Sequence, residues 1–145
     1  MIRHGLSAYK KLYCKYGVVM KNKNNCILLR QIGKFVNAFD EDALIISYLF
    51  NYKLINGKIG FPIDTLPKII NILEEYHINY ETKGTNNDIV MNFRNRNKYS
   101  NILEKAILKK KMSDRIYSIS DKLPDLSTEQ LDKIISFIES VINEK

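Results

Sequence analysis

The stretch from Ile27 to Phe39, ILLRQIGKFVNAF, constrains the fold of this chain more than any other part of it. Apolar residues precede Gly33, and beyond the glycine the side chains of an extended backbone point alternately to two sides. Phe35 and Asn37 then share one side, while Val36 falls on the other. If Val36 is buried against a core, the Phe35 ring points outward beside a polar amide and can stack on a flat partner. The alternative is a core aromatic, since Phe is often buried.

The patterns on either side of this stretch predict an α/β fold with a mixed sheet and helices packed against it. Strands are expected from Cys26, at Phe35–Phe39, at Tyr52–Ile55, at Lys58–Phe61, after Tyr76 and at Ile89–Phe93. Helices are expected from Ser7 to Gly17, from Asp40 to Phe50, and from Asp64 or Thr65 through Leu73. The dipeptide Asn56-Gly57 is typical of a two-residue hairpin turn.

The C-terminal third predicts helices. Tyr99–Lys111 and Ser113–Ile119 are two expected helical segments, and Pro124 ends the second. Ser127 and Gln130 form a capping box for a last amphipathic helix. Its apolar stripe either packs on the rest of the chain or pairs with another subunit. We therefore predict an α/β domain at residues 1–95 and a helical extension at 96–145.

Three short motifs carry a family resemblance: GKFVNAFDEDA at residues 33–43, GFP at 60–62 and INY at 78–80. Their order and spacing resemble the N-terminal mismatch-recognition domain, domain I, of the MutS DNA mismatch-repair family, over roughly residues 7 to 83. In that family a G-D-F-Y-E segment places its Phe against a mispaired base from the minor groove, and its Glu hydrogen-bonds the same base. The resemblance implies that Phe35 stacks on a base and that Asn37 replaces the Glu.

Departures from the family pattern bear on specificity. Asn37 carries no charge, so it lacks the repulsion that a Glu exerts on phosphates, and we expect weaker discrimination with higher general duplex affinity. Lys34 stands where the family usually has an acid, and it either contacts a phosphate or is a solvated lysine. Arg30 and Lys58 are further candidates for backbone contacts, although the segment between Tyr52 and Gly60 is shorter than its family counterpart.

The formal net charge of +7 is concentrated in two blocks. Residues 1–24 contain basic but no acidic side chains, and residues 91–111 contain seven basic side chains against one glutamate. Such blocks favour a polyanionic partner, although solvated lysines that keep the protein soluble are the alternative. The candidates for phosphate contacts in these blocks are Lys10, Lys11, Lys21, Lys23, Arg94 and Arg96.

ATP binding, nucleophilic catalysis and metal binding have little support in these 145 residues. No G-x-x-x-x-G-K-[ST] loop of the kind that binds ATP is present, and no Ser-His-Asp or Cys-His constellation has convincing spacing. Cys14, Cys26, His4 and His77 give no metal-ligand spacing, so we expect no metal, no cofactor and no enzymatic activity. No apolar run is long enough for a membrane span and no signal peptide is evident, which predicts a cytoplasmic protein.

The sequence thus predicts a non-catalytic DNA-binding protein, with the bound DNA left open among duplex, mismatched and single-stranded forms. Residues 127–144 are a candidate homodimer interface. The alternative is a protein-interaction or regulatory adaptor that keeps the fold without binding nucleic acid. Salt dependence separates the two, because phosphate contacts weaken as salt rises whereas an apolar interface does not.

Overall fold

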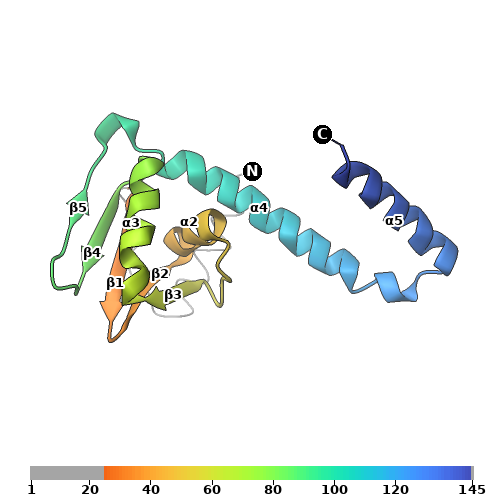
Figure 1. Ribbon diagram of the computed structural model, residues 1–145, viewed down its shortest axis with the longest axis horizontal. Coiled ribbons are helices and arrows are strands. Elements are labelled where there is room, and N and C mark those ends of the chain that lie inside the picture. The colour runs from red at the N-terminus through yellow and green to blue at the C-terminus, as the bar shows by residue number, and fades with distance from the viewer. Residues whose placement is uncertain (1–24, 145) are drawn as a thin grey trace. The chain divides into compact units, whose positions relative to one another are not determined.

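The computed structural model describes residues 25–144 of the chain (Figure 1). The predicted helix from Ser7 to Gly17 lies outside these residues. The strands are β1 (Ile27–Ile32), β2 (Phe35–Phe39), β3 (Lys58–Pro62), β4 (Tyr80–Lys83) and β5 (Val90–Met91). The helices are α2 (Asp40–Phe50), α3 (Leu66–Glu75), α4 (Tyr99–Ser120) and α5 (Thr128–Ile142). Single short turns of helix are η1 (Ile63–Thr65), η2 (Arg94–Arg96) and η3 (Leu123–Asp125).

Within the described residues, the five strands form one mixed sheet in the order β3-β2-β1-β4-β5. β1 pairs with β4 in parallel, whereas the β1–β2, β2–β3 and β4–β5 pairs are antiparallel. α3 connects β3 to β4 and runs across the sheet in Figure 1, as the crossover between parallel strands requires. The predicted α/β class, with a mixed sheet and helices packed on it, is confirmed.

The two faces of the sheet differ sharply. The inner face carries the buried core residues Ile27, Leu29, Val36, Ala38, Ile59, Phe61 and Tyr80. Buried residues of α2, α3 and the first turns of α4 join the same cluster. The Tyr80 hydroxyl donates to Glu74 Oε2 on α3 at 2.6 Å, which shows that α3 lies over this face. We call the opposite side, on which the alternate strand residues lie, the outer face.

The hairpin between β1 and β2 explains why Phe35 and Val36 point to opposite faces of the sheet, as their alternation predicts. Ile32 and Phe35 are paired, so the loop consists of Gly33 and Lys34 alone. Gly33 has φ +64°, and a positive φ at the first loop residue fits a type II′ turn, for which glycine is suited. This turn fixes the register that places Val36 inward.

Two secondary-structure predictions are wrong. Tyr52–Ile55 is not a strand; only Ile55 pairs, with Lys58 across the predicted Asn56-Gly57 turn. The Tyr52 carbonyl instead accepts a hydrogen bond from Ser47 Oγ at 2.7 Å, so this segment packs back on α2 rather than extending the sheet.

The helical segments expected on either side of Met112 are one helix, α4. Neither proline nor glycine interrupts it, and Lys110 pairs with Asp114 one turn later at 2.6 Å.

The chain divides into two compact units, residues 1–109 and 110–145. The first unit includes the start of α4, because Tyr99, Ile102 and Ala106 are part of its core. In the second unit the predicted capping box of α5 is confirmed: Ser127 Oγ accepts from Gln130 N at 3.2 Å, and Gln130 Oε1 accepts from Ser127 N at 3.0 Å. Among the described residues, no helix has the length and apolar character needed to cross a membrane.

Candidate nucleic-acid interface

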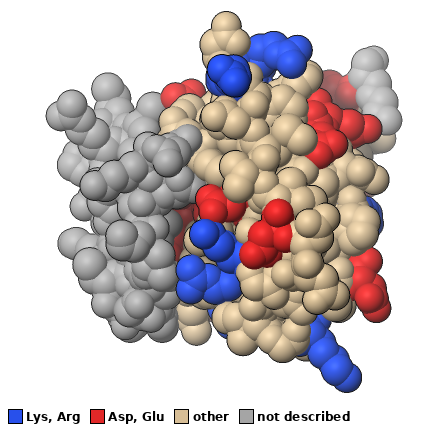
Figure 2. Space-filling model, turned by 90° about the vertical axis from the view of Figure 1, so that its left-hand side faces the viewer, with Lys and Arg blue, Asp and Glu red and all other residues tan. Residues whose placement is uncertain are grey.

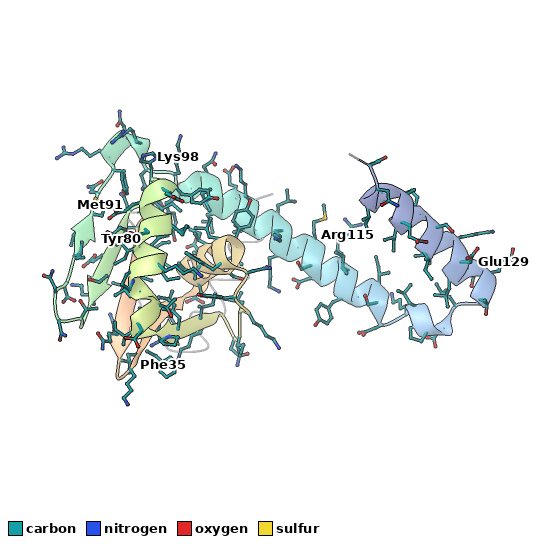
Figure 3. All side chains as sticks on the ribbon, viewed as in Figure 1. Phe35, Tyr80, Met91, Lys98, Arg115 and Glu129 are labelled. Atoms are coloured by element: carbon teal, nitrogen blue, oxygen red, sulfur yellow. The ribbon has the colours of Figure 1, made fainter. Side chains whose placement is uncertain are left out.

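Phe35 is the exposed aromatic residue at the end of the sheet nearest the β1–β2 turn. Its side chain is 52% exposed, while the next residue, Val36, is fully buried opposite Phe61 of β3. Figure 3 shows Phe35 at the free end of the hairpin, with its side chain directed away from the helices. The sequence prediction that Phe35 points outward is therefore confirmed, and the core alternative is not what the structure shows.

Ile32 extends this exposed apolar surface. It is 56% exposed and is the cross-strand partner of Phe35. Paired residues of an antiparallel ladder project from the same face, so the two side chains are neighbours. Sequence analysis missed Ile32, although the two-residue loop Gly33-Lys34 would have revealed the pairing.

The strand register brings basic side chains to the same outer face. Arg30 pairs with Asn37, and Lys58 pairs with Phe39, so both cations project from the side that carries Phe35. Lys34 lies in the hairpin loop beside Phe35, and all three side chains are exposed. Arg30, Lys34 and Lys58 thus lie on one face of the sheet, with Lys34 next to Phe35 and Lys58 at the other end of β2, opposite Phe39. Their contacts with DNA stay a prediction.

Lys83 is a fourth cation of this face that sequence analysis missed. It pairs with Arg30 across the parallel β1–β4 ladder, and this pairing between distant segments left no local signal. Its ammonium group lies 3.1 Å from Glu81 Oε1, so part of its charge is compensated.

Asn37 differs from its neighbours because its side chain is only 5% exposed. Across the ladder stands Gly60, where a Cβ atom would lie 2.9 Å from Asn37 Oδ1, so glycine makes room for the amide. Asn37 has no side-chain hydrogen bond to another residue within the described range. Its predicted contact with a base edge stays a prediction, and it requires that the amide become accessible when DNA binds.

Arg94 and Arg96 lie at the other end of the sheet from Phe35. They belong to η2, which begins two residues after the end of β5. The partner strand of β5, β4, begins beside Ile27 at the start of β1. The length of β1 separates them from the hairpin, roughly 16 Å at the rise of an extended strand. The structure therefore does not gather these arginines with Phe35, and they are candidates for a separate backbone contact.

An asparagine network fixes the segment that carries these arginines. Asn79 Oδ1 accepts a hydrogen bond from Phe93 N at 2.6 Å, and Asn79 Nδ2 donates to Asn92 Oδ1 at 3.2 Å. Asn97 Oδ1 accepts from Asn79 N at 3.0 Å. The backbone around η2 is thus tied to the start of β4, which gives the arginines a defined position.

The basic side chains do not form one continuous surface in the view of Figure 2. Blue groups are separated there by acidic and uncharged residues. A ligand that used them together would have to span several of these groups, as a nucleic-acid backbone does. The predicted phosphate contacts of Lys10, Lys11, Lys21 and Lys23 lie outside the described residues.

Among residues 25–144, neither the described cysteine nor a cluster of metal-ligating side chains offers a candidate site. Burial, with Asp42 and Glu81 nearby, raises the pKa of Cys26 to about 12, so its thiol is a poor nucleophile. Within residues 25–144, no group of three or more His, Cys, Asp or Glu side chains is arranged to hold a metal ion.

Comparison with known proteins adds the decisive observation. Residues 11–75 match the family model of MutS domain I. The chain contains a domain of the MutS domain I type. No curated protein and no solved structure matches the chain. The match to MutS domain I includes the hairpin with Phe35, Lys34 and Arg30 and continues through Lys58 of β3 to the end of α3. It ends before Arg94.

Proposed function

We propose that the chain is a non-catalytic DNA-binding protein that uses the outer face of its MutS domain I-like sheet. The exposure of Phe35 beside Ile32, on a face that also carries Arg30, Lys34 and Lys58, supports this proposal. An apolar side chain held out from a rigid strand can wedge or stack between bases, while cations around it neutralise phosphates. The match to MutS domain I supports DNA as the ligand, because that domain recognises mispaired bases in its family.

Replacement of Phe35 by alanine tests this proposal. Stacking of a base on an aromatic ring contributes about 1–3 kcal/mol, so we expect Phe35→Ala to weaken DNA binding roughly 5- to 150-fold. The measurement is fluorescence anisotropy with matched duplex, single-mismatch duplex and single-stranded DNA, each at two salt concentrations. The preferred DNA identifies which structure the protein recognises.

The matched control for this test is Tyr76→Ala. Tyr76 is 45% exposed but follows α3, the helix on the inner face, so its loss is expected to leave affinity unchanged. Because the Phe35 ring is half exposed, its removal is expected to leave the melting temperature nearly unchanged. A sharp fall in melting temperature, or equal loss of binding in both variants, would contradict the stacking role.

The second unit favours an additional candidate function, protein interaction through a second copy of the chain. None of the residues of α5 is buried within the described structure, and its apolar stripe includes Ile135, Ile138 and Val141, each about half exposed. We infer that residues 127–144 pair as a homodimer, because two copies of one amphipathic stripe are complementary to each other. Sedimentation equilibrium of wild type and Ile138→Asp tests this. A dimer that persists at high salt and dissociates in the variant is expected, and a monomer at every concentration would exclude it.

A further inference from the structure

A hollow with a volume of about 570 Å³ lies beside β3, at the junction of β2 and α2. Phe39 and Ile55 provide apolar walls, and the Asn56-Gly57 turn closes one side. Lys53 and Lys58 line it with exposed side chains. The hollow therefore combines an apolar interior with positive charge.

Asp40 is an unsatisfied buried group in the wall of this hollow. It is 4% exposed, and its Oδ2 atom is buried with no hydrogen-bond partner. Within the described residues, no donor reaches either oxygen of the carboxyl group. Buried polar groups without a partner are rare in native proteins, because a buried donor or acceptor that lacks a partner destabilises the folded state. A hydrogen-bond donor supplied by a ligand would satisfy this carboxyl.

The backbone holds the Asp40 carboxyl in place. Asp40 has φ +53°, an uncommon conformation for a residue other than glycine, and its N–H donates to the Gly57 carbonyl at 2.6 Å. A Cβ atom on Gly57 would lie 2.9 Å from Asp40 Oδ1, so the carboxyl lies against the turn that forms the wall. Burial and the neighbouring Glu41 raise the pKa of Asp40 to about 6, which leaves the group mainly ionised at pH 7.5 and able only to accept.

The chemistry of the hollow selects a particular kind of ligand. Asp40 is the one carboxylate in its described lining, which is too few oxygen ligands for a divalent cation, and Lys53 and Lys58 repel cations. A ligand that fits must donate hydrogen bonds at one end, be apolar in its middle and carry negative charge outside. A nucleotide with an amino or imino group on its base has these properties.

We propose that this hollow binds one unstacked nucleobase, which donates hydrogen bonds to the carboxyl of Asp40 and lies between Phe39 and Ile55. Lys53 and Lys58 hold the phosphates next to that base. Guanine is the preferred base, since its ring imino group and its amino group point the same way and offer two adjacent donors to the carboxyl. Contact with both oxygens requires that the buried Oδ2 become accessible when the base binds. This inference rests on the proposed DNA-binding function and adds a second base-binding position to it, at the β3 edge.

The test compares two duplexes of one sequence, one with a single unpaired guanosine and one with an abasic linker at that position. We expect wild type to bind the guanosine duplex about tenfold or more tightly, the effect of one or two hydrogen bonds to a charged group. Asp40→Asn should remove this preference, because an amide presents one oxygen and one NH₂ group in place of two acceptors. The control Glu75→Gln, which removes an exposed charge at the end of the inner-face helix α3, should keep it.

A second variant keeps the test interpretable if Asp40→Asn does not fold. Ile55→Trp changes an exposed side chain and fills the hollow, so it should also remove the preference. If Ile55→Trp and Asp40→Asn both keep the wild-type preference, or if wild type binds the two duplexes equally tightly, the inference is overturned while Phe35-dependent DNA binding can still stand.

Titration with guanosine monophosphate tests base binding by the hollow independently of DNA binding by the outer face. Titration of the free nucleotide against wild type and Asp40→Asn should show binding that depends on Asp40. Such binding in a protein that binds none of the DNA duplexes would support the hollow and refute the DNA-binding function. Equal or absent binding by both proteins, together with no preference for the guanosine duplex, would refute the hollow.

Discussion

The folded protein is expected to become less stable as the pH rises from about 4 to about 7, with Asp42 as a main cause. Burial raises the pKa of Asp42 from 3.8 to about 7, against the opposing effect of hydrogen bonds from Leu28 and Tyr99. The folded state thus holds a proton in this range that the unfolded state has released. Each pH unit within the window lowers the free energy of unfolding by about 1.4 kcal/mol, and the full window by roughly 4 kcal/mol.

Asp42→Asn isolates this effect from the titration of other groups. Asp42 Oδ2 accepts from Leu28 N at 3.0 Å, and Oδ1 accepts from the Tyr99 hydroxyl at 2.6 Å. An asparagine keeps an oxygen for Leu28 N, and its NH₂ group can donate to the Tyr99 oxygen once the hydroxyl rotates. Urea denaturation at pH 5 and pH 7.5 should therefore show a smaller loss of stability in the variant. The same loss in both proteins would mean that Asp42 keeps an ordinary pKa.

Binding of DNA is expected to fall about 40-fold when salt rises from 50 to 200 mM, if Arg30, Lys34 and Lys58 each neutralise one phosphate. Every phosphate contact on a duplex adds about −0.9 to the slope of log affinity against log salt, so three contacts give about −2.7. The substitutions Arg30→Gln, Lys34→Gln and Lys58→Gln should each reduce the steepness of that slope by about 0.9. Anisotropy titrations at four salt concentrations measure it.

Lys68→Gln provides the matched comparison for this slope. Lys68 is an exposed lysine of α3, which lies over the inner face, so its loss removes the same net charge without removing a contact. A slope that falls equally in Lys68→Gln would point to general attraction by the positive net charge. A slope near zero in wild type would refute phosphate binding by the outer face.

Local sequence was sufficient for several features of the candidate site. The outward direction of Phe35 followed from its alternation with Val36, because side chains of a strand point alternately to the two faces. The Asn56-Gly57 turn followed from the same kind of short-range rule, since few residues adopt the positive φ angles found there. The family motifs are short runs of adjacent residues in a fixed order, which made the resemblance to MutS domain I visible without any structure.

Tertiary structure decided which further cations lie on the face of Phe35 and which polar groups are buried. β4 joins β1 in parallel and brings Lys83 beside Arg30, while Arg94 and Arg96 are placed at the far end of the sheet. Strand pairing likewise places the buried side chain of Asn37 opposite Gly60.

The acids at the start of α2 show most clearly that burial and hydrogen-bond partners could not be predicted from the sequence. Asp40, Glu41 and Asp42 read alike in sequence as acids that favour a helix start. In the fold, the Asp42 carboxyl accepts hydrogen bonds from the Leu28 amide and the Tyr99 hydroxyl, which belong to distant segments. The Asp40 carboxyl lies against the Asn56-Gly57 turn, and its Oδ2 accepts no hydrogen bond from the described residues. Backbone direction and turn type are set by neighbours along the chain, so the sequence determined them. Hydrogen-bond partners and burial depend on segments far apart in the chain, so only the folded structure decided them.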